Sequence, residues 1–213
     1  MPNYPVMVSG ILLGVFGVVG AGLVGLSHEV TAERIARNDR EVLLRQLQTL
    51  VPPAQTDNDM LTDFIDITSP QLAAGEPVRV YRGRLGDQPV AVVLSPVITQ
   101  GYSGPIRLIV AIRRGGDLAG VRVLTHRETP GLGDKVEVER SDWIRGFTGR
   151  SLANPQPVGW KVKRDGGEFD QFTGATVTPR AVVSGVKVAL EYFAEHADRL
   201  FGAAQSAKEN SDG

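Results

Sequence analysis

The sequence predicts an α+β protein, in which an apolar N-terminal helix and a helical stalk precede a mostly antiparallel sheet domain with packed helices. Residues 1–28 contain no Asp, Glu, Lys or Arg. Several segments between residues 78 and 123 alternate apolar and polar side chains, as strands do. The segment from Val182 to Leu200 repeats apolar residues every three or four positions, as an amphipathic helix does. Strands followed by helices, rather than alternating with them, favour the α+β class.

The composition narrows the possible functions. The 213 residues suffice for one domain with an appendage, or for two small domains. Lys and Arg total 23 and Asp and Glu total 24, so no nucleic-acid partner is expected. The absence of cysteine excludes disulfides, thiol catalysis and thiolate-bound zinc or iron–sulfur clusters. The three histidines are spread along the chain, so no multi-histidine metal or haem site is predicted. If the protein transfers electrons, an organic cofactor is the expected carrier.

The first element is a 22-residue apolar stretch, Val6–Ser27. At about 1.5 Å per residue, a helix of this length measures about 33 Å and crosses a bilayer. A cleaved signal peptide is the alternative, but no Lys or Arg precedes the stretch, and the stretch is too long for a signal peptide's apolar core. We therefore predict a transmembrane anchor at 1–28. Small residues spaced by four suit packing against another membrane helix: Gly10 and Gly14, then Gly17, Ala21 and Gly25.

A helical stalk, 29–53, is the second element. Its apolar residues recur at roughly helical spacing, and Pro52 and Pro53 end the helix. A soluble domain, 54–201, follows, and the polar or small residues of 202–213 predict a flexible tail. The count of positive charges after the anchor would by itself place this domain in the cytoplasm. The arginines concerned are Arg34, Arg37, Arg40 and Arg45.

The soluble domain begins with predicted strands and ends with a predicted helix. Strands are expected around Val78–Val80, within 89–99, at 106–112 and around Val121–Val123, with turns at 86–87 and 115–117. Ser141 is expected to cap a short helix that ends at Phe147. Trp160 and Val162 predict one more strand, ended by 165–167. Thr178 is the expected N-cap and Pro179 the first residue of the long closing helix.

Two motifs in this domain could carry chemistry. The first, DQFTGATVTP at 170–179, places three threonine hydroxyls and a glycine at the start of the closing helix, where free N–H groups favour a phosphate. The second, ETPGLGD at 128–134, has glycines that let the backbone approach a flat ligand closely. A well-capped helix and an ordinary surface loop explain the same residues without a ligand. Neither motif is a GxGxxG dinucleotide fingerprint.

Together, these motifs resemble the FMN-binding domain of the G subunit of the Rnf ion-translocating electron-transport complex. The related C subunit of the sodium-pumping NADH:quinone reductase has a similar motif. The resemblance covers the anchor, the stalk, GYSG at 101–104, the glycine loop, 169–179 and the closing helix. It implies that a separate flavin transferase, which reads Asp170, attaches FMN from FAD to Thr176 through a phosphoester bond. Further implied cofactor contacts are Glu128, Thr129, Gly131, Leu132, Gly133, Thr173, Gly174, Ala175, Val177 and Thr178.

The resemblance also implies a function and a place in the cell. It predicts an electron-transfer subunit with covalent FMN in the bacterial inner membrane, with its domain on the periplasmic side, against the arginine count. Its partners would be the other membrane and redox subunits of the complex and, during maturation, the flavin transferase. No catalytic residue is assigned to the chain itself.

Several side chains are expected near the flavin. Backbone N–H groups of Gly131–Gly133 would face the ring, and His126 and Glu128 would hydrogen-bond the ring or the ribityl chain. The alternative for these two residues is a polar pair at the end of a strand, in contact with water. Lys135, Lys163, Arg164 and Arg180 are candidate counter-charges for the phosphate.

Two other functions remain open from the residues alone. A membrane-tethered scaffold domain would use the threonine motif only structurally. A hydrolase with Thr176 or Thr178 as nucleophile lacks an evident base, because His126 is the only histidine near the motif.

Overall fold

The computed structural model describes residues 4–202, which form two compact units that divide after Leu43. The first unit is most of one uninterrupted helix, α1 (Tyr4–Leu50), which runs through the predicted anchor and the predicted stalk. Within the described residues, the segment Met7–Ser27 is the one helical stretch that is long and apolar enough to cross a membrane. The helix ends at Leu50, before Pro52 and Pro53.

The second unit is built on a six-stranded sheet in which each strand pairing is antiparallel, which confirms the predicted α+β class. Strand β5 is central, because it pairs with β3, β4 and β6. Glycines with positive φ, Gly86 and Gly116, lie in the predicted tight turns that join β2 to β3 and β5 to β6. The strands are β1 (Phe64–Thr68), β2 (Pro77–Leu85), β3 (Gln88–Leu94), β4 (Val97–Ile98), β5 (Ile106–Arg113) and β6 (Leu118–Thr125).

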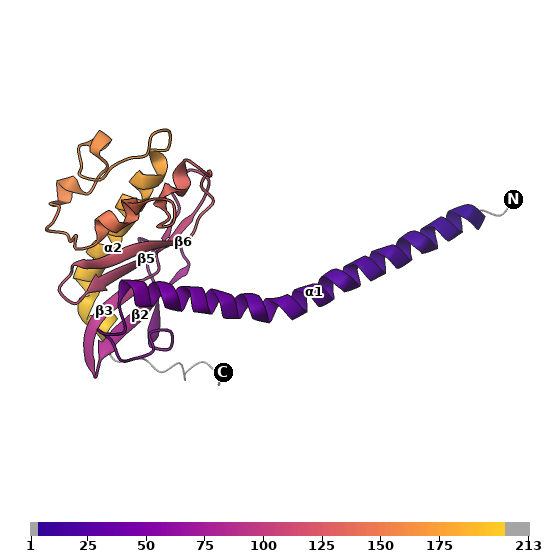
Figure 1. Cartoon of the computed structure of the whole chain (residues 1–213), viewed down its shortest axis with the longest axis horizontal. Coiled ribbons are helices and arrows are strands. Elements are labelled where there is room, and N and C mark those ends of the chain that lie inside the picture. Colours follow the sequence, from indigo (N-terminus) through magenta and orange to yellow (C-terminus); the bar gives the residue numbers. More distant parts are fainter. Residues whose placement is uncertain (1–3, 203–213) are drawn as a thin grey trace. The chain divides into compact units, whose positions relative to one another are not determined.

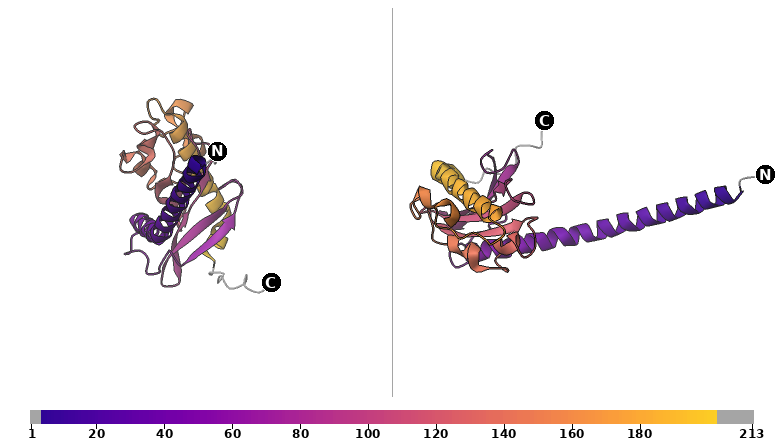
Figure 2. Two further views of the ribbon diagram at one scale, coloured as in Figure 1. Left: turned by 90° about the vertical axis from the view of Figure 1, so that its right-hand side faces the viewer. Right: turned by 90° about the horizontal axis from the view of Figure 1, so that it is seen from above.

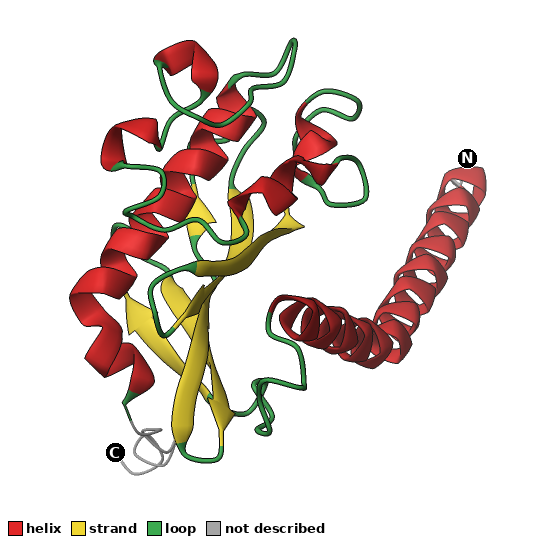
Figure 3. Ribbon diagram, turned by 60° about the vertical axis from the view of Figure 1, so that its left-hand side comes forward, coloured by secondary structure: helices red, strands yellow, loops and turns green. Residues whose placement is uncertain are grey.

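One face of this sheet is covered by the closing helix, α2 (Val177–Phe201) (Figure 3). Alternate residues of β5, such as Leu108 and Val110, form the main core with Val186 and Leu190 of α2. The residues between them point to the opposite face, because side chains alternate along a strand. Since Ile109 is also fully buried, both faces of β5 are covered.

The opposite face is covered by the end of α1 and the loop that follows it. Leu47 and Leu50 are buried, and a side-chain carbon of Leu50 lies so close to Gly120 of β6 that a Cβ there would be 2.7 Å away. The compact unit therefore begins within the segment that the sequence analysis assigned to the stalk.

The segment between β6 and α2 is gathered at the end where α2 begins (Figures 1 and 2). It contains four short 3₁₀ helices, and the predicted cap is confirmed, since Ser141 Oγ accepts a hydrogen bond from the Trp143 N–H at 3.2 Å. The short helices are η1 (Gly133–Val136), η2 (Asp142–Phe147), η3 (Pro157–Gly159) and η4 (Lys163–Asp165).

The strand predicted at Trp160 and Val162 was wrong. Val162 makes a single isolated bridge with Phe169, between turns η3 and η4. Trp160 packs against Phe147 and Phe169 in an aromatic cluster, with ring centroids 6.3 and 5.1 Å away. The apolar alternation therefore reflects two turns that bury side chains in this cluster.

The predicted start of the closing helix was also wrong, by two residues. Thr176 is the N-cap and Val177 the first residue, so Thr178 lies within the first turn, fully buried. Pro179 remains acceptable there, because the N–H groups of the first turn have no partner within the helix.

At its other end, α2 is fastened to strand β2. Arg82 Nη1 donates to the Gly202 carbonyl at 2.6 Å, and Arg84 Nη2 donates to the same carbonyl at 3.0 Å. Asp63 accepts from the Nε of both arginines, at 2.7 and 2.8 Å. The predicted flexible tail, 202–213, lies outside the described residues except for Gly202.

Candidate functional site

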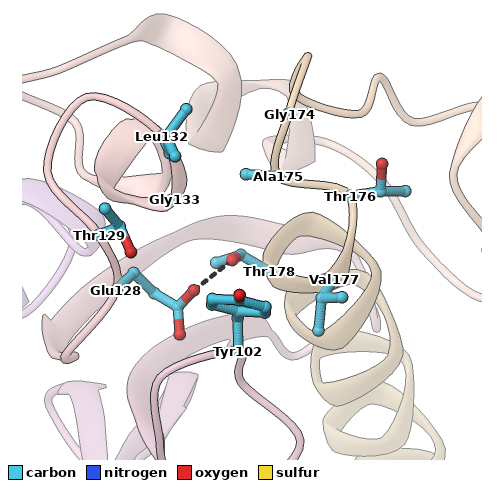
Figure 4. A pocket seen from close by; sticks show the side chains of 10 residues that line it. All are labelled: Tyr102, Glu128, Thr129, Leu132, Gly133, Gly174, Ala175, Thr176, Val177 and Thr178. Atoms are coloured by element: carbon cyan, nitrogen blue, oxygen red, sulfur yellow. Dashed lines mark hydrogen bonds between the residues drawn. The ribbon is translucent and has the colours of Figure 1, made fainter.

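A cavity of about 200 Å³ lies at the N-terminal end of α2 (Figure 4). Three segments far apart in the sequence line it: the loop before β5, the loop after β6 and the turn that leads into α2. These segments contain the three motifs singled out in the sequence. The lining residues are Tyr102, Glu128, Thr129, Leu132, Gly133, Gly174, Ala175, Thr176, Val177 and Thr178.

The carboxylate of Glu128 joins the three segments. Its Oε1 accepts a hydrogen bond from the backbone N–H of Ser103 at 3.0 Å, and its Oε2 accepts one from the hydroxyl of Thr178. Glu128 is 5% exposed, so both bonds lie in a poorly solvated place where an unpaired carboxylate would be costly. This buried group fixes the relative positions of the loops around the cavity.

Close packing around Glu128 requires glycine on two sides. A Cβ at Gly133 would lie 2.8 Å from Cβ and Oε2 of Glu128 and 2.9 Å from Oγ1 of Thr178. A Cβ at Gly101 would lie 2.1 Å from the carbonyl oxygen of Gly104. The glycines of both loops therefore permit contact between protein segments, in addition to any contact with a ligand.

The turn that leads into α2 is anchored at both ends. Phe172 is buried and packs edge-on against Trp143, with ring centroids 5.2 Å apart. The Ala175 N–H donates to the Phe172 carbonyl at 3.1 Å, and Gly174 has a φ of 82°, as the third residue of a type II turn requires. Together with the buried Thr178, this turn holds Thr176 at the start of the helix.

The two candidate threonines have different surroundings. Thr176 is half-buried at the rim of the cavity and is the N-cap of α2 (Figure 4). Thr178 has no exposed surface, and its hydroxyl is committed to Glu128. Of these two hydroxyls, that of Thr176 is the accessible one.

Some predicted site residues lie outside the cavity lining. Thr173 and Gly131 are exposed in the two loops beside it. The backbone N–H groups of Leu132 and Gly133 both donate to the Thr129 carbonyl at 3.1 Å. Both N–H groups therefore already have a partner within the turn, and their expected contact with a ring stays a prediction.

His126 is also directed elsewhere. Its Nδ1 accepts from the Glu128 N–H at 3.0 Å, so its proton is on Nε2, which donates to Glu137 Oε1 at 2.7 Å. His126 therefore links the backbone of Glu128 to the side chain of Glu137, and it is not among the residues that line the cavity.

The four candidate counter-charges also lie outside the residues that line the described cavity. Lys163 Nζ is 2.6 Å from a carboxylate oxygen of Asp170, which is exposed, and Trp143 Nε1 donates to the Asp170 carbonyl at 2.8 Å. Arg180 donates two hydrogen bonds to Asp165, and these bonds hold the pKa of that carboxyl below its ordinary value. The remaining two candidates are Lys135 and Arg164.

Tyr102, for which no role was predicted from the sequence, lies at the mouth of the cavity (Figure 4). The available signal was a large aromatic residue between two glycines at 101–104.

Comparisons with known proteins agree with this arrangement. Residues 101–191 match the model of the FMN-binding domain, which spans all three cavity segments, and residues 5–50 match the RnfG N-terminal region. The G subunit of the ion-translocating oxidoreductase complex of Pseudomonas aeruginosa is 46% identical over 200 residues, which cover 93% of this chain and 94% of that relative. The chain belongs to this family of G subunits.

Other members are similar over nearly their whole length. The corresponding protein of Vibrio cholerae is 42% identical over 192 residues, 90% of this chain and 92% of the relative. That of Cereibacter sphaeroides is 45% identical over 194 residues, 91% of this chain and 87% of the relative. As a member of this family, the chain pairs an N-terminal apolar helix with an FMN-binding domain, and the cavity lies in that domain.

Proposed function

We propose that this chain is the electron-transferring G subunit of a membrane-bound ion-translocating oxidoreductase complex and carries FMN in the cavity at the start of α2. The proposal rests on one observation: Tyr102, residues of 128–133 and residues 174–178, which are far apart in the sequence, line one cavity. The other subunits of such a complex are its partners.

The residues of the cavity suit FMN. Tyr102, Leu132 and Ala175 offer aromatic and aliphatic surface for a planar ring system, while Thr129 and Thr176 offer hydroxyls for the ribityl chain and phosphate. When bound, FMN supplies the capacity to take up and release electrons. The protein binds it, orients it and limits its contact with water.

We further propose that the FMN phosphate is esterified to Thr176. Thr176 is partly exposed whereas Thr178 is fully buried, and this difference supports the choice. In the reaction, Thr176 Oγ bonds to the phosphorus of the FMN half of FAD, the pyrophosphate bond breaks, AMP leaves, and a base of the transferase takes the hydroxyl proton. The resulting phosphodiester has one negative charge, which the N-terminus of α2 stabilises.

A separate flavin transferase would recognise the turn through Asp170. The Asp170 side chain is 68% exposed, and its backbone is held by Trp143, so the carboxylate is presented at a defined place on the surface. Contact with the transferase would replace the exposed ion pair with Lys163, which costs little free energy.

We place the anchor, 1–28, in the bacterial inner membrane as a single span, with the domain on the periplasmic side. The apolar stretch Met7–Ser27 supports the span. The arginines after it favour the opposite orientation, but partner subunits can orient a single span whose N-terminal flank has no charge. An active alkaline phosphatase fused to the C-terminus supports this orientation, and an inactive one beside an active cytoplasmic reporter overturns it.

The attachment is tested with the full chain coexpressed with a flavin transferase. We compare wild type with Thr176→Val and with Thr148→Val, which changes an exposed threonine outside both the motif and the cavity lining and serves as matched control. We expect flavin fluorescence of the denatured band, and an FMN-modified peptide by mass, in wild type and Thr148→Val only. Fluorescence that persists in Thr176→Val, or that is absent from wild type while the transferase modifies another substrate, would overturn the proposal.

A further inference from the structure

Exposed apolar side chains gather around the cavity. Among the described residues from Leu44 onward, five large hydrophobic side chains are exposed, and three of them line this cavity: Tyr102, Leu132 and Val177. Tyr102 is 72% exposed, the largest fraction of the five. Because a tyrosine ring gains free energy on burial, a defined position in water at the mouth of a cavity points to a surface that a ligand covers.

The loop that carries Tyr102 is held tightly on both sides of the tyrosine. Gly104 has a φ of 140°, and the carbonyl of Gly104 lies so near Gly101 that no side chain fits there. The next residue, Ser103, donates its backbone N–H to the buried carboxylate of Glu128 at 3.0 Å. The position of the tyrosine is therefore fixed by the backbone, although its ring has few protein neighbours.

Tyr102 and Leu132 both line the cavity, and in Figure 4 Leu132 lies above and Tyr102 below the hydrogen bond between Glu128 and Thr178. Leu132 is 42% exposed and touches the turn before Thr176, since a Cβ at Gly174 would lie 3.4 Å from Leu132 Cδ2. An aromatic wall and an aliphatic wall in one cavity suit a planar ligand better than they suit a protein surface.

We propose that Tyr102 and Leu132 enclose the ring system of the flavin, with the phenol ring of Tyr102 stacked on one face and the Leu132 side chain on the other. This inference rests on the proposed FMN at Thr176. An offset stack of two aromatic systems stabilises the seated ring beyond the area that it buries. The tyrosine thereby keeps a tethered ring, free to swing on its ribityl chain, in one orientation and out of water.

The test uses the full chain in detergent, loaded with FMN by the transferase. Fluorescence of the denatured band reports loading, fluorescence of the folded protein reports contact with tyrosine, and quenching by iodide reports exposure of the ring to water. A phenol that stacks on a flavin quenches its emission by donating an electron to the excited state. The variants are Tyr102→Phe, Tyr102→Leu and, as control, Val158→Ala, which removes an exposed apolar side chain outside the cavity lining.

We expect Tyr102→Phe to fluoresce more strongly when folded but to keep the low iodide sensitivity of wild type, because phenylalanine stacks without quenching. In Tyr102→Leu we expect strong fluorescence and an increase of about fivefold in the exposed ring population, the factor that one aromatic pair supplies. Val158→Ala should match wild type in both measurements.

Two results would overturn the inference, and they are distinguishable. Normal covalent loading with no change of fluorescence or iodide sensitivity in Tyr102→Leu would mean that Tyr102 does not touch the ring and serves another surface. Absence of flavin from the denatured wild-type band would overturn the proposed function itself, and this inference with it.

Discussion

Replacing Gly133 with alanine is expected to destabilise the domain, because the glycine lies against the carboxylate that joins the three loops. A new Cβ would be 2.8 Å from Cβ and Oε2 of Glu128 and 2.9 Å from Oγ1 of Thr178. These atoms cannot move aside easily, since Glu128 and Thr178 are buried and hydrogen-bonded to each other. The loop or the carboxylate must shift instead.

The size of the effect follows from two opposing contributions. Forcing one carbon into a packed site costs roughly 1–3 kcal/mol. Alanine also restricts the unfolded chain, which stabilises the folded state by about 0.4–1 kcal/mol. The free energy of unfolding should therefore fall by about 1–2 kcal/mol. Gly146 is the matched control, because it also lies in a 3₁₀ helix but has nothing within 4 Å of the position of a Cβ.

The assay is urea unfolding of the full chain in detergent, followed by the fluorescence of Trp143 and Trp160. We expect a lower midpoint with an unchanged slope for Gly133→Ala, and an equal or higher midpoint for Gly146→Ala. Equal midpoints for wild type and Gly133→Ala would refute the reasoning, because they would mean that the packing around Glu128 yields without cost.

Two further predictions concern ion pairs. Asp63→Ala leaves Arg82, which is 1% exposed, without its carboxylate and should cost about 3–5 kcal/mol, whereas Asp66→Ala removes an exposed pair and should cost about 1 kcal/mol or less. Equal losses in urea unfolding would contradict this difference. Arg180→Gln removes the hydrogen bonds that lower the pKa of Asp165, so that pKa, followed by NMR titration, should rise toward its ordinary value. In wild type this pair stabilises the fold above the ordinary carboxyl pKa and loses its effect as the pH falls through the lowered pKa, so an unchanged Asp165 pKa in the variant would refute the assignment.

The apolar N-terminal segment, two hairpins and the closing helix could be predicted from the sequence, because each depends on residues that are close together in the chain. An uncharged stretch at 1–28 indicates a membrane span through composition alone. The hairpins at Gly86 and Gly116 follow from turn chemistry between alternating strands. The apolar spacing of 182–200 predicted the closing helix, although its start lay two residues earlier than the capping residues indicated.

The alternating pattern at Trp160 and Val162 led to the wrong prediction of a strand. Alternation indicates which side chains are buried, but it does not indicate which element they pack against. Here an aromatic cluster, rather than a neighbouring strand, does so. The strand Phe64–Thr68 was not predicted, although its short segment alternates apolar and polar side chains as a strand does.

The site depends on contacts that only tertiary structure provides. The hydrogen bond between Thr178 and Glu128 joins residues 50 positions apart, and it removes one of the two candidate hydroxyls from solvent. The sequence by itself determined that a turn leads into a helix near Thr176, since capping, turns and apolar spacing depend on residues a few positions apart. Which threonine stays accessible, and which tyrosine faces the cavity, depended on how the sheet brings distant loops together.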